Sequence, residues 1–434
     1  MSITKRRGLF SRRSSCIACL CAFALVAQGR LARAQSETGP EPPPRSDEDA
    51  GKDGSPSLGY DGGFFIESSD ERFELKINGR VQGRFAFESV EEHVQAPSGG
   101  DEPSDAASGE ASATRRRDEE YAFSVPRARL KLKGHAFGEN LSWAMQVEFG
   151  KGFAYLKDYY VDAGLVPGKL HLRLGQYKRP FSRQQITSSG KQELVDRSIT
   201  DKAFGAGRDI GLMFHNKLTK SPPFEWAIGV FNGTGEKPWF EGEVLVDTSS
   251  GEGEVTKARY TNVPDRLEPA AVVRIGYNYG DLKGYSEADL EGGGPRFGVG
   301  ASGIASFDSD GDDDSSIRGE LDYVLKLHGF STSGAFFAGS AQDGNDFQDQ
   351  SFAALGFYAQ AGFVFGDFIQ PAVRYAIVDP DGEENSSQQI LGGLSFYFFG
   401  HNVKWQTDGG AVLRQVEAGD LTDYLVRTQL QLAF

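Results

Sequence analysis

The stretch VPRARLKLKGHAF, residues 125–137, alternates basic and apolar side chains with a period of two. The basic set is Arg127, Arg129, Lys131, Lys133 and His135, and the apolar set between them is Ala128, Leu130, Leu132, Gly134 and Ala136. Successive side chains of a β-strand point to opposite faces. The stretch therefore predicts a strand with one apolar face and one basic face.

Such a strand suits two kinds of protein. In a water-soluble sandwich, the apolar face meets a protein core and the basic face meets bulk water. In an outer-membrane barrel, the apolar face meets lipid and the basic face lines an aqueous lumen. Other parts of the sequence have to decide between these two settings.

Residues 1–34 have the features of a secretory signal peptide. A basic start, MSITKRRGLFSRRSS, is followed by the short apolar run CIACLCAFALVA and then by Ala32, Arg33 and Ala34. The apolar run is too short to cross a bilayer as a helix. We therefore expect export with cleavage after Ala34. Because Cys16, Cys19 and Cys21 are the three cysteines of the chain, the exported protein would have neither disulfides nor cysteine metal sites.

The chain that remains after removal of the predicted signal peptide is acidic. Residues 1–34 carry seven Lys or Arg and no Asp or Glu, so their removal changes the formal net charge from −15 to −22. This acidity argues against nucleic acid as a partner. Residues 35–69, charged and Pro-rich up to about Ser57, are expected to form a disordered extension. Residues 70–434 are left as one domain.

Alternation recurs through the rest of the chain, and no run of about 18 apolar residues indicates a membrane helix. No pattern of helical period competes with it, which predicts an all-β fold. The sixteen alternating segments lie approximately at residues 73–87, 121–137, 141–149, 156–165, 169–178, 208–216, 224–232, 270–279, 296–306, 317–327, 330–338, 352–364, 368–378, 389–399, 403–413 and 423–434.

The connections between these segments favour a barrel. Odd connections are long or acidic, apart from GKGFAY at 150–155, whereas most even ones are short, apart from 280–295 and the intermediate 217–223. Bacterial barrels alternate long external loops with short periplasmic turns, and a sandwich gives no reason for this parity. We therefore expect a sixteen-stranded antiparallel transmembrane β-barrel.

The quoted segments resemble the phosphate-selective porin O and P family of Gram-negative outer membranes. The resemblance covers roughly residues 70–434 and rests on LKINGRVQGRF (75–85), RARLKLKG (127–134), LKDYYVDAGL (156–165), the long segment 172–211, HNVKWQTD and the terminal YLVRTQLQLAF. It implies a homotrimer whose third external loop folds into the lumen as a constriction. Residues 180–207 occupy that position, and the basic candidates in and beside this loop are Arg179, Arg183, Lys191, Arg197 and Lys202.

Alternation places a basic ladder inside the predicted barrel. If Leu130 and Leu132 face lipid, the basic set points into the lumen. The candidate pore-lining residues are then Arg80, Arg84, Arg127, Arg129, Lys131, Lys133 and Arg173. Arg offers a fork of donors to phosphate oxygens, and Lys offers a compact charge. A series of weak sites lets an anion bind and leave, as conduction requires. We therefore expect passive diffusion of small anions, phosphate or polyphosphate among them.

Two alternatives stay open. Glu74, Glu148, Asp158, Asp162, Glu320 and Asp322 should also face inward, so a general or cation-preferring porin is the first. A structural or adhesive surface barrel is the second. External acidic loops are screened within about 8 Å at physiological salt, so charges inside the pore should dominate selectivity.

The sequence indicates no enzyme, cofactor or resident metal. The histidines are scattered without metal-ligand spacing, and nothing singles out a placed nucleophile and base. The acidic stretch DSDGDDDSS, residues 308–316, lacks the spacing of a calcium loop. We interpret it as a solvated loop that divalent cations could bridge to lipopolysaccharide. Outer-membrane lipid and lipopolysaccharide are the remaining expected partners.

Overall fold

The structure is a computed structural model that describes residues 55–94, 114–150, 152–236, 239–246, 253–264, 267–307, 315–341, 352–380 and 385–434. The predicted signal peptide, its cleavage site and its cysteines lie outside these ranges. So do residues 35–54 of the predicted extension and residues 308–314 of the acidic stretch.

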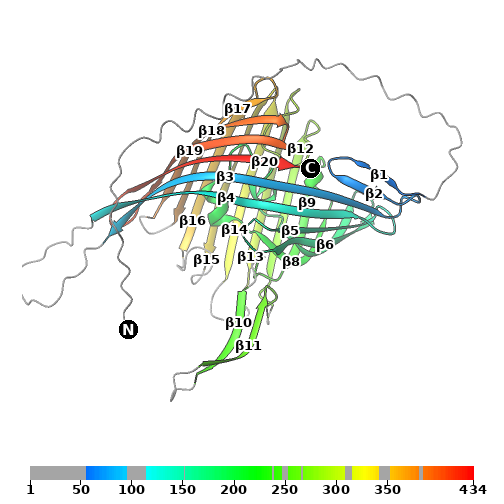
Figure 1. Ribbon diagram of the computed structural model, residues 1–434, viewed down its shortest axis with the longest axis horizontal. Helices are drawn as coiled ribbons and strands as arrows, with labels where there is room; N and C mark the ends of the chain where they lie inside the picture. The colour runs from blue at the N-terminus through cyan, green and yellow to red at the C-terminus, as the bar shows by residue number, and fades with distance from the viewer. Residues whose placement is uncertain are drawn as a thin grey trace, which may run out of the picture. The chain divides into compact units, whose positions relative to one another are not determined.

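Sixteen strands of the described ranges form one closed antiparallel ring (Figure 1). Ring neighbours follow one another in the chain, with β10 and β11 left out, and β20 pairs with β3 to close the ring. The ring strands are β3 (Glu74–Val94), β4 (Thr114–His135), β5 (Leu141–Glu148), β6 (Tyr155–Val166), β7 (Leu170–Lys178), β8 (Arg208–His215), β9 (Phe224–Phe231), β12 (Ala270–Tyr279), β13 (Arg296–Ser306), β14 (Ser316–Leu327), β15 (Phe330–Ala341), β16 (Phe352–Phe363), β17 (Ile369–Pro380), β18 (Ser387–Phe399), β19 (Val403–Arg414) and β20 (Leu421–Ala433).

The end of the chain completes the seam between β20 and β3. The paired residues run from Tyr424 opposite Ser89 to Ala433 opposite Arg80. Beyond them, Phe434 and Gly79 exchange two backbone hydrogen bonds of 3.0 Å. A Cβ on Gly79 would lie 2.4 Å from the Phe434 ring, so the terminal phenylalanine packs where only glycine leaves room.

The outer surface of the ring is apolar, and most of the inner surface is polar or charged. On β12, Val273, Ile275 and Tyr277 are about half exposed, whereas the alternate residues Arg274 and Asn278 are buried. A water-soluble sandwich would bury the valine and expose the arginine. The opposite arrangement confirms the barrel setting of the alternating strands.

The stretch that opens the sequence argument lies on β4 with its basic residues inward. Lys131 pairs with Asn78 and Gln146, which also face inward, and Leu130 lies on the outer surface. A bulge precedes it, because Gln82 is opposite Arg127 whereas Arg84 is opposite Ser124. The extra residue of β4 at this point resets the alternation, so the basic run begins at Arg127.

All sixteen predicted strands are present. Their bounds agree with the expected ones within three residues, except that β3 and β4 each continue seven residues further toward the loop that joins them. Those extra residues are mostly charged. Because apolar and polar side chains do not alternate there, the sequence pattern does not predict that they belong to strands. They pair across the hairpin all the same, as Arg117 does with Glu91 at 3.5 Å.

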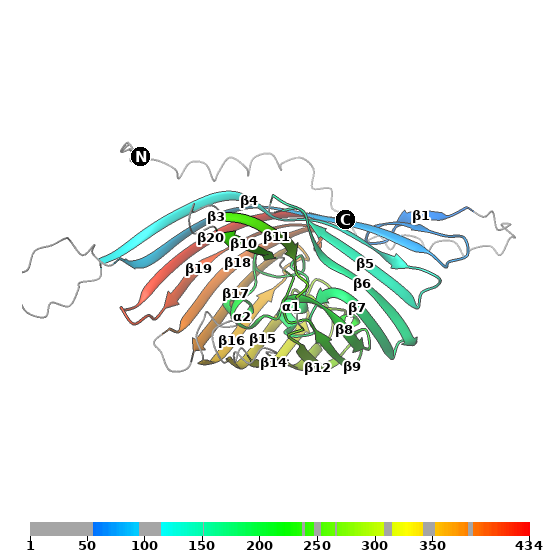
Figure 2. The same cartoon turned by 90° about the horizontal axis from the view of Figure 1, so that it is seen from below.

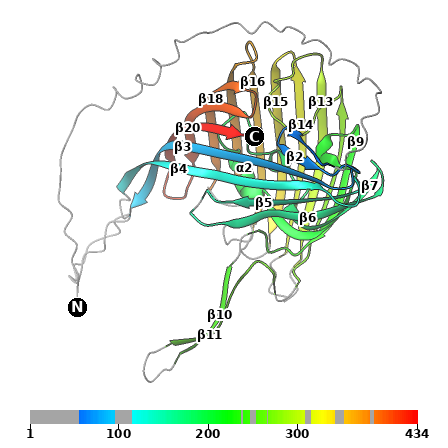
Figure 3. The same ribbon diagram turned by 45° about the vertical axis from the view of Figure 1, so that its right-hand side comes forward.

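The sequence pattern did not predict two hairpins that the structure contains. Strands β1 (Ser57–Tyr60) and β2 (Phe64–Glu67) form the first, so the disordered extension expected over residues 35–69 is wrong for this part of it. Strand β2 pairs with β3 from Ile77 to Glu74, on the same edge as β20. Strands β10 (Trp239–Val246) and β11 (Gly253–Thr261) form the second, which projects away from the ring (Figure 3).

The segment between β7 and β8 contains α1 (Arg183–Ile186) and α2 (Ile199–Phe204), and η1 (Leu218–Lys220) follows β8. Figure 2 draws α1 and α2 between β4 and β14–β16. Phe181 and Phe204 of this segment belong to an apolar cluster with Phe337 and Tyr358, which lie on β15 and β16. None of the helices in the described ranges has the length and apolar character that a membrane span requires.

The barrel predicts a lipid-specific cost on its outer surface. Leu321, in the middle of β14, is 63% exposed, and Val263, between β11 and β12, is 49% exposed. Leu321→Arg should lower the free energy of unfolding in lipid vesicles by about 2–4 kcal/mol. Val263→Arg should change it by less than about 0.5 kcal/mol. Urea unfolding measures both, and equally small effects would mean that β14 faces water.

Candidate functional site

The predicted pore-lining residues lie where the alternation places them. Arg80 and Arg84 are inward on β3, Arg173 is inward on β7, and the remaining four are inward on β4. Arg80 is directly opposite Arg129, and Lys76 is directly opposite Lys133. Like charges at such positions destabilise a sheet. Other groups must therefore neutralise or hydrate them.

A cavity of about 580 Å³ lies against this wall, and we call it the basic cavity. Nine basic side chains and one acidic side chain, Asp158, line it together with uncharged residues. The basic ones are Arg80, Arg129, Lys131, Lys133, Arg173, Lys178, Lys191, Arg208 and Lys220. Arg208 pairs with Asp158 at 2.7 Å, so the lining keeps a large positive excess although the whole chain is acidic.

Four lysines of the basic cavity have side chains without a partner among the described residues. Lys131, Lys133, Lys191 and Lys220 make no ion pair or side-chain hydrogen bond with any residue in the described part of the chain. In a polar cavity, an ammonium group that is not paired with a carboxylate is hydrated, and it can exchange that water for an anion. These lysines are therefore the cavity's free cationic groups.

Most arginines of the wall are instead paired with carboxylates, although Arg80 donates to serine hydroxyls. Arg129 donates to Glu148 at 2.5 Å, and Glu148, only 1% exposed, also accepts from the backbone of Ala128 at 2.7 Å. Arg173 donates to Asp162 at 2.7 Å and lies over the Tyr160 ring. This wall thus contains arginines held by carboxylates and lysines without a partner among the described residues, a division that the alternation does not reveal.

Asp162 gathers a buried cluster of its own. His171 lies 3.0 Å from one of its oxygens and His215 lies 2.8 Å from the other, and the two imidazole rings stack. Within the described ranges, no group of three or more His, Cys, Asp or Glu is arranged to hold a metal ion. The cluster neutralises Arg173 and fixes the two histidines in place.

The segment 179–207 is hydrogen-bonded to the inner wall. Arg80 donates to the hydroxyls of Ser188 and Ser189 at 3.0 and 3.1 Å. Lys178 and Arg197 both donate to backbone carbonyls at the end of α1, including that of Thr187 at 3.1 Å. These two basic groups therefore hold the segment's own backbone, although Lys178 also borders the basic cavity.

Asp196 of this segment meets three arginines, which we call the arginine triad. Arg84 donates to both of its oxygens, at 2.7 and 3.0 Å, and Arg127 and Arg427 each donate at 3.2 Å. Burial alone would raise the pKa of Asp196, which is not on a membrane-spanning strand. The Arg84 hydrogen bonds and the charges of the triad outweigh burial and lower that pKa.

The other loop candidates lie away from the basic cavity. Arg183 is buried, donates to Asp322 at 2.5 Å and lies over the Tyr285 ring. Arg179 is buried near Asp209, with 3.6 Å between the charged atoms. Lys202 is exposed on α2 and does not line the cavity. Of the five predicted loop residues, the structure places Lys191 at the cavity.

A second segment, 280–295, contributes to the same region, and the sequence marked it only as an unusually long even connection. Its Glu287 donates its backbone N–H to the Lys191 carbonyl at 3.1 Å and accepts from the Glu193 N–H at 2.9 Å. Lys326 on β14 donates to the Ala288 carbonyl at 2.8 Å. Burial and the nearby Glu287 charge raise the pKa of Glu193, in the segment 179–207, to about 7. Tyr285, Glu287 and Asp289 of this connection are buried in the structure. The sequence does not show that burial, so these residues could be identified as part of the site only from the fold.

Comparison with known proteins identifies the family. The family model described as phosphate-selective porin O and P matches residues 105–434. The chain belongs to this family. The family and the closed barrel together point to a channel in the outer membrane of a Gram-negative bacterium rather than to an enzyme.

Individual relatives of this porin are distant. A protein described as uncharacterized, from Aquifex aeolicus (strain VF5), is 24% identical over 290 residues, which cover 58% of this chain and 60% of the relative. An anion-selective porin from Comamonas acidovorans matches with a TM-score of 0.50 and 12% identity, over 83% of this chain and 100% of that one. The outer membrane channel DcaP of Acinetobacter baumannii matches with 0.51 and 12%, over 83% and 97%. At such identities the solved structures support the fold alone.

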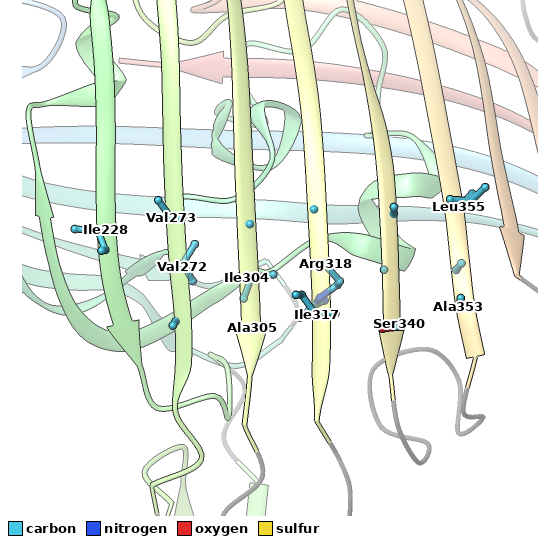
Figure 4. A pocket seen from close by; sticks show the side chains of 16 residues that line it. Ile228, Val272, Val273, Ile304, Ala305, Ile317, Arg318, Ser340, Ala353 and Leu355 are labelled. Carbon is cyan, nitrogen blue, oxygen red and sulfur yellow. The ribbon is translucent and has the colours of Figure 1, made fainter.

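This porin also has an apolar hollow of about 750 Å³, shown in Figure 4. It spans β9 and β12–β16, and Ile228, Val273, Ile317 and Leu355 line it from outward positions. Small residues such as Ala305 lower the surface between them. The hollow therefore belongs to the lipid-facing surface and is separate from the basic cavity.

The division between held and free basic residues in this porin can be measured as stability. Arg129→Met leaves the buried Glu148 without its counter-charge and should lower the free energy of unfolding by about 3–5 kcal/mol. Lys131→Met, on the same face of β4, removes an unpaired charge and should not lower it. Urea unfolding in lipid vesicles compares the two variants. Equal losses would contradict the assignment of Lys131 as free.

Proposed function

We propose that this porin gives passive diffusion of small anions, with phosphate or polyphosphate as the class of solute that its donors fit best. The single observation that carries the proposal is the basic cavity, where nine basic side chains face one carboxylate. Charges inside a narrow low-dielectric passage act on a solute more strongly than screened charges at the surface.

The segment 179–207 is, in this proposal, the third external loop folded inward as a constriction. Support comes from its contacts with well-separated strands: Arg80 of β3 donates to Ser188, and Lys404 of β19 donates to the Gln192 carbonyl at 2.8 Å. Lys191 lies in the same segment and borders the basic cavity. The narrow part of the passage would then carry a free ammonium group.

The two classes of basic residue have different roles in the proposed conduction. Arginines fixed by carboxylates, such as Arg129, give the wall a defined shape and a preorganised positive surface. Free lysines, such as Lys131 and Lys133, exchange water for an anion's oxygens without breaking a protein contact. Binding at each step is then favourable yet weak, which conduction requires.

A further part of the proposal concerns export and assembly. Export with cleavage after Ala34 and assembly as a homotrimer follow the features of the sequence and the family resemblance. Contact with lipopolysaccharide is proposed for the external face on the same ground. A general or cation-preferring porin is the second candidate, because the chain carries a net charge of −15 and many wall arginines are neutralised by carboxylates.

Reversal potentials across a planar bilayer under a KCl gradient test anion preference. The wild type should favour chloride over potassium. The double variant Lys131→Ala/Lys133→Ala should lower the anion-to-cation permeability ratio by about tenfold, because it removes two free charges from the passage.

A matched control removes the same charge elsewhere. Lys169 and Lys217 are exposed, lie in even connections at the same end of the barrel and do not line the basic cavity. Lys169→Ala/Lys217→Ala should leave the ratio near the wild-type value. Potassium preference of the wild type would favour the second candidate instead, and the absence of current from folded protein would favour a structural or adhesive role.

A further inference from the structure

The arginine triad has the composition of an oxyanion site. Arg84, Arg127 and Arg427 come from β3, β4 and β20, and their guanidinium groups converge on the two oxygens of Asp196. A carboxylate and a phosphate present the same kind of acceptor oxygens to an arginine fork. Asp196 thus fills a position whose geometry suits a solute anion.

Each arginine of the triad has a second partner that orients it without Asp196. Arg84 donates to the Gln429 side chain at 2.9 Å, and Arg127 donates to that of Gln82 at 3.0 Å. Arg427 donates two hydrogen bonds of 2.8 Å to Asp408. The site is therefore preorganised, and loss of the Asp196 side chain would leave three aligned guanidinium groups.

The loop backbone around Asp196 is also anchored independently of that side chain. Arg374 donates to the Asp196 carbonyl at 2.8 Å, and the Val195 N–H donates to Asp408 at 3.0 Å. Gln406 donates to the Glu193 carbonyl at 2.8 Å. The carboxylate can turn away from the triad while the segment keeps its place.

Position and charge suit exchange with a solute. The Asp196 side chain is 27% exposed, so solvent reaches it. Arg80 borders the basic cavity, and Arg84 lies further along β3, toward the connection between β3 and β4. With Asp408 counted, the cluster carries a net charge of +1, which becomes +2 when Asp196 leaves. A phosphate of one or two negative charges restores the balance.

We propose that the arginine triad is an anion-binding site in series with the basic cavity, that Asp196 occupies it as an internal competitor, and that a permeating oxyanion displaces the Asp196 carboxylate. The inference rests on the proposed anion function and adds a specific resting occupant. Asp196 then sets the affinity of the arginine triad for the oxyanion, since only the fraction of channels in which the carboxylate is turned away can bind it.

The test is block of chloride current by inorganic phosphate in planar bilayers. Asp196→Asn keeps the shape of the side chain and removes its charge, so the phosphate concentration that halves the current should fall by about tenfold. Asp201→Asn is the matched control. It removes a carboxylate charge from the same segment, where Asp201 lies near Arg197 rather than the triad, and it should leave that concentration within a factor of about two of wild type.

A second variant and a second readout keep the test decisive. Adding Arg127→Gln to Asp196→Asn should abolish the gain in phosphate block. In detergent, phosphate should raise the unfolding temperature of Asp196→Asn more than that of wild type, because a ligand stabilises the state that binds it. This readout does not depend on ion flow, so it separates the inference from the proposed function.

Two outcomes would overturn the inference. One is an equal phosphate block in Asp196→Asn and wild type, with equal thermal shifts. The other is an equal gain in the Asp201→Asn control, which would reduce the effect to net charge. Cation preference of the wild type, with a phosphate-dependent thermal shift still enhanced in Asp196→Asn, would refute the proposed function and leave the triad site intact.

Discussion

The backbone hydrogen bonds between β20 and β3 close the sheet, and the other features of this porin depend on that closure. Hydrocarbon offers no partner for an open strand edge. The chain meets this constraint to its last residue, where Phe434 bonds to Gly79. Once the ring is closed, each strand has one face toward lipid and one toward the lumen. Outward valines and leucines and inward arginines are then two consequences of the same geometry.

Closure concentrates charge inside the ring, and the structure manages that charge in two ways. Most wall arginines face a carboxylate, as Arg129 faces Glu148 and Arg274 faces Asp322. These pairs stabilise the wall and use up acidic groups that would otherwise attract cations. At the basic cavity, Lys131, Lys133, Lys191 and Lys220 have no such partner among the residues that the structure describes. A chain with a net charge of −15 can in this way place an excess of basic side chains around one cavity.

Alternation with a period of two predicted the sixteen strands, because each strand meets two different solvents. It also placed Arg80 and Lys133 on the inner surface. It failed where pairing is not driven by that contrast: at the charged ends of β3 and β4, and at β1–β2 and β10–β11. Alternation also did not predict which side chains contact one another. That Asp196 joins Arg84 to Arg427, or that Glu287 meets Lys191, depends on contacts between residues about a hundred or more positions apart.

Chemical labelling of single cysteines tests the central claim directly, since the three cysteines of the chain lie in residues 1–34. Lys131→Cys should react about tenfold faster with an anionic methanethiosulfonate than with a cationic one, because the basic cavity attracts the anion. Leu130→Cys, one residue away on the lipid side, should react with neither reagent. Faster reaction of Lys131→Cys with the cationic reagent, or ready labelling of Leu130→Cys from water, would contradict a positively charged lumen enclosed by an apolar outer surface.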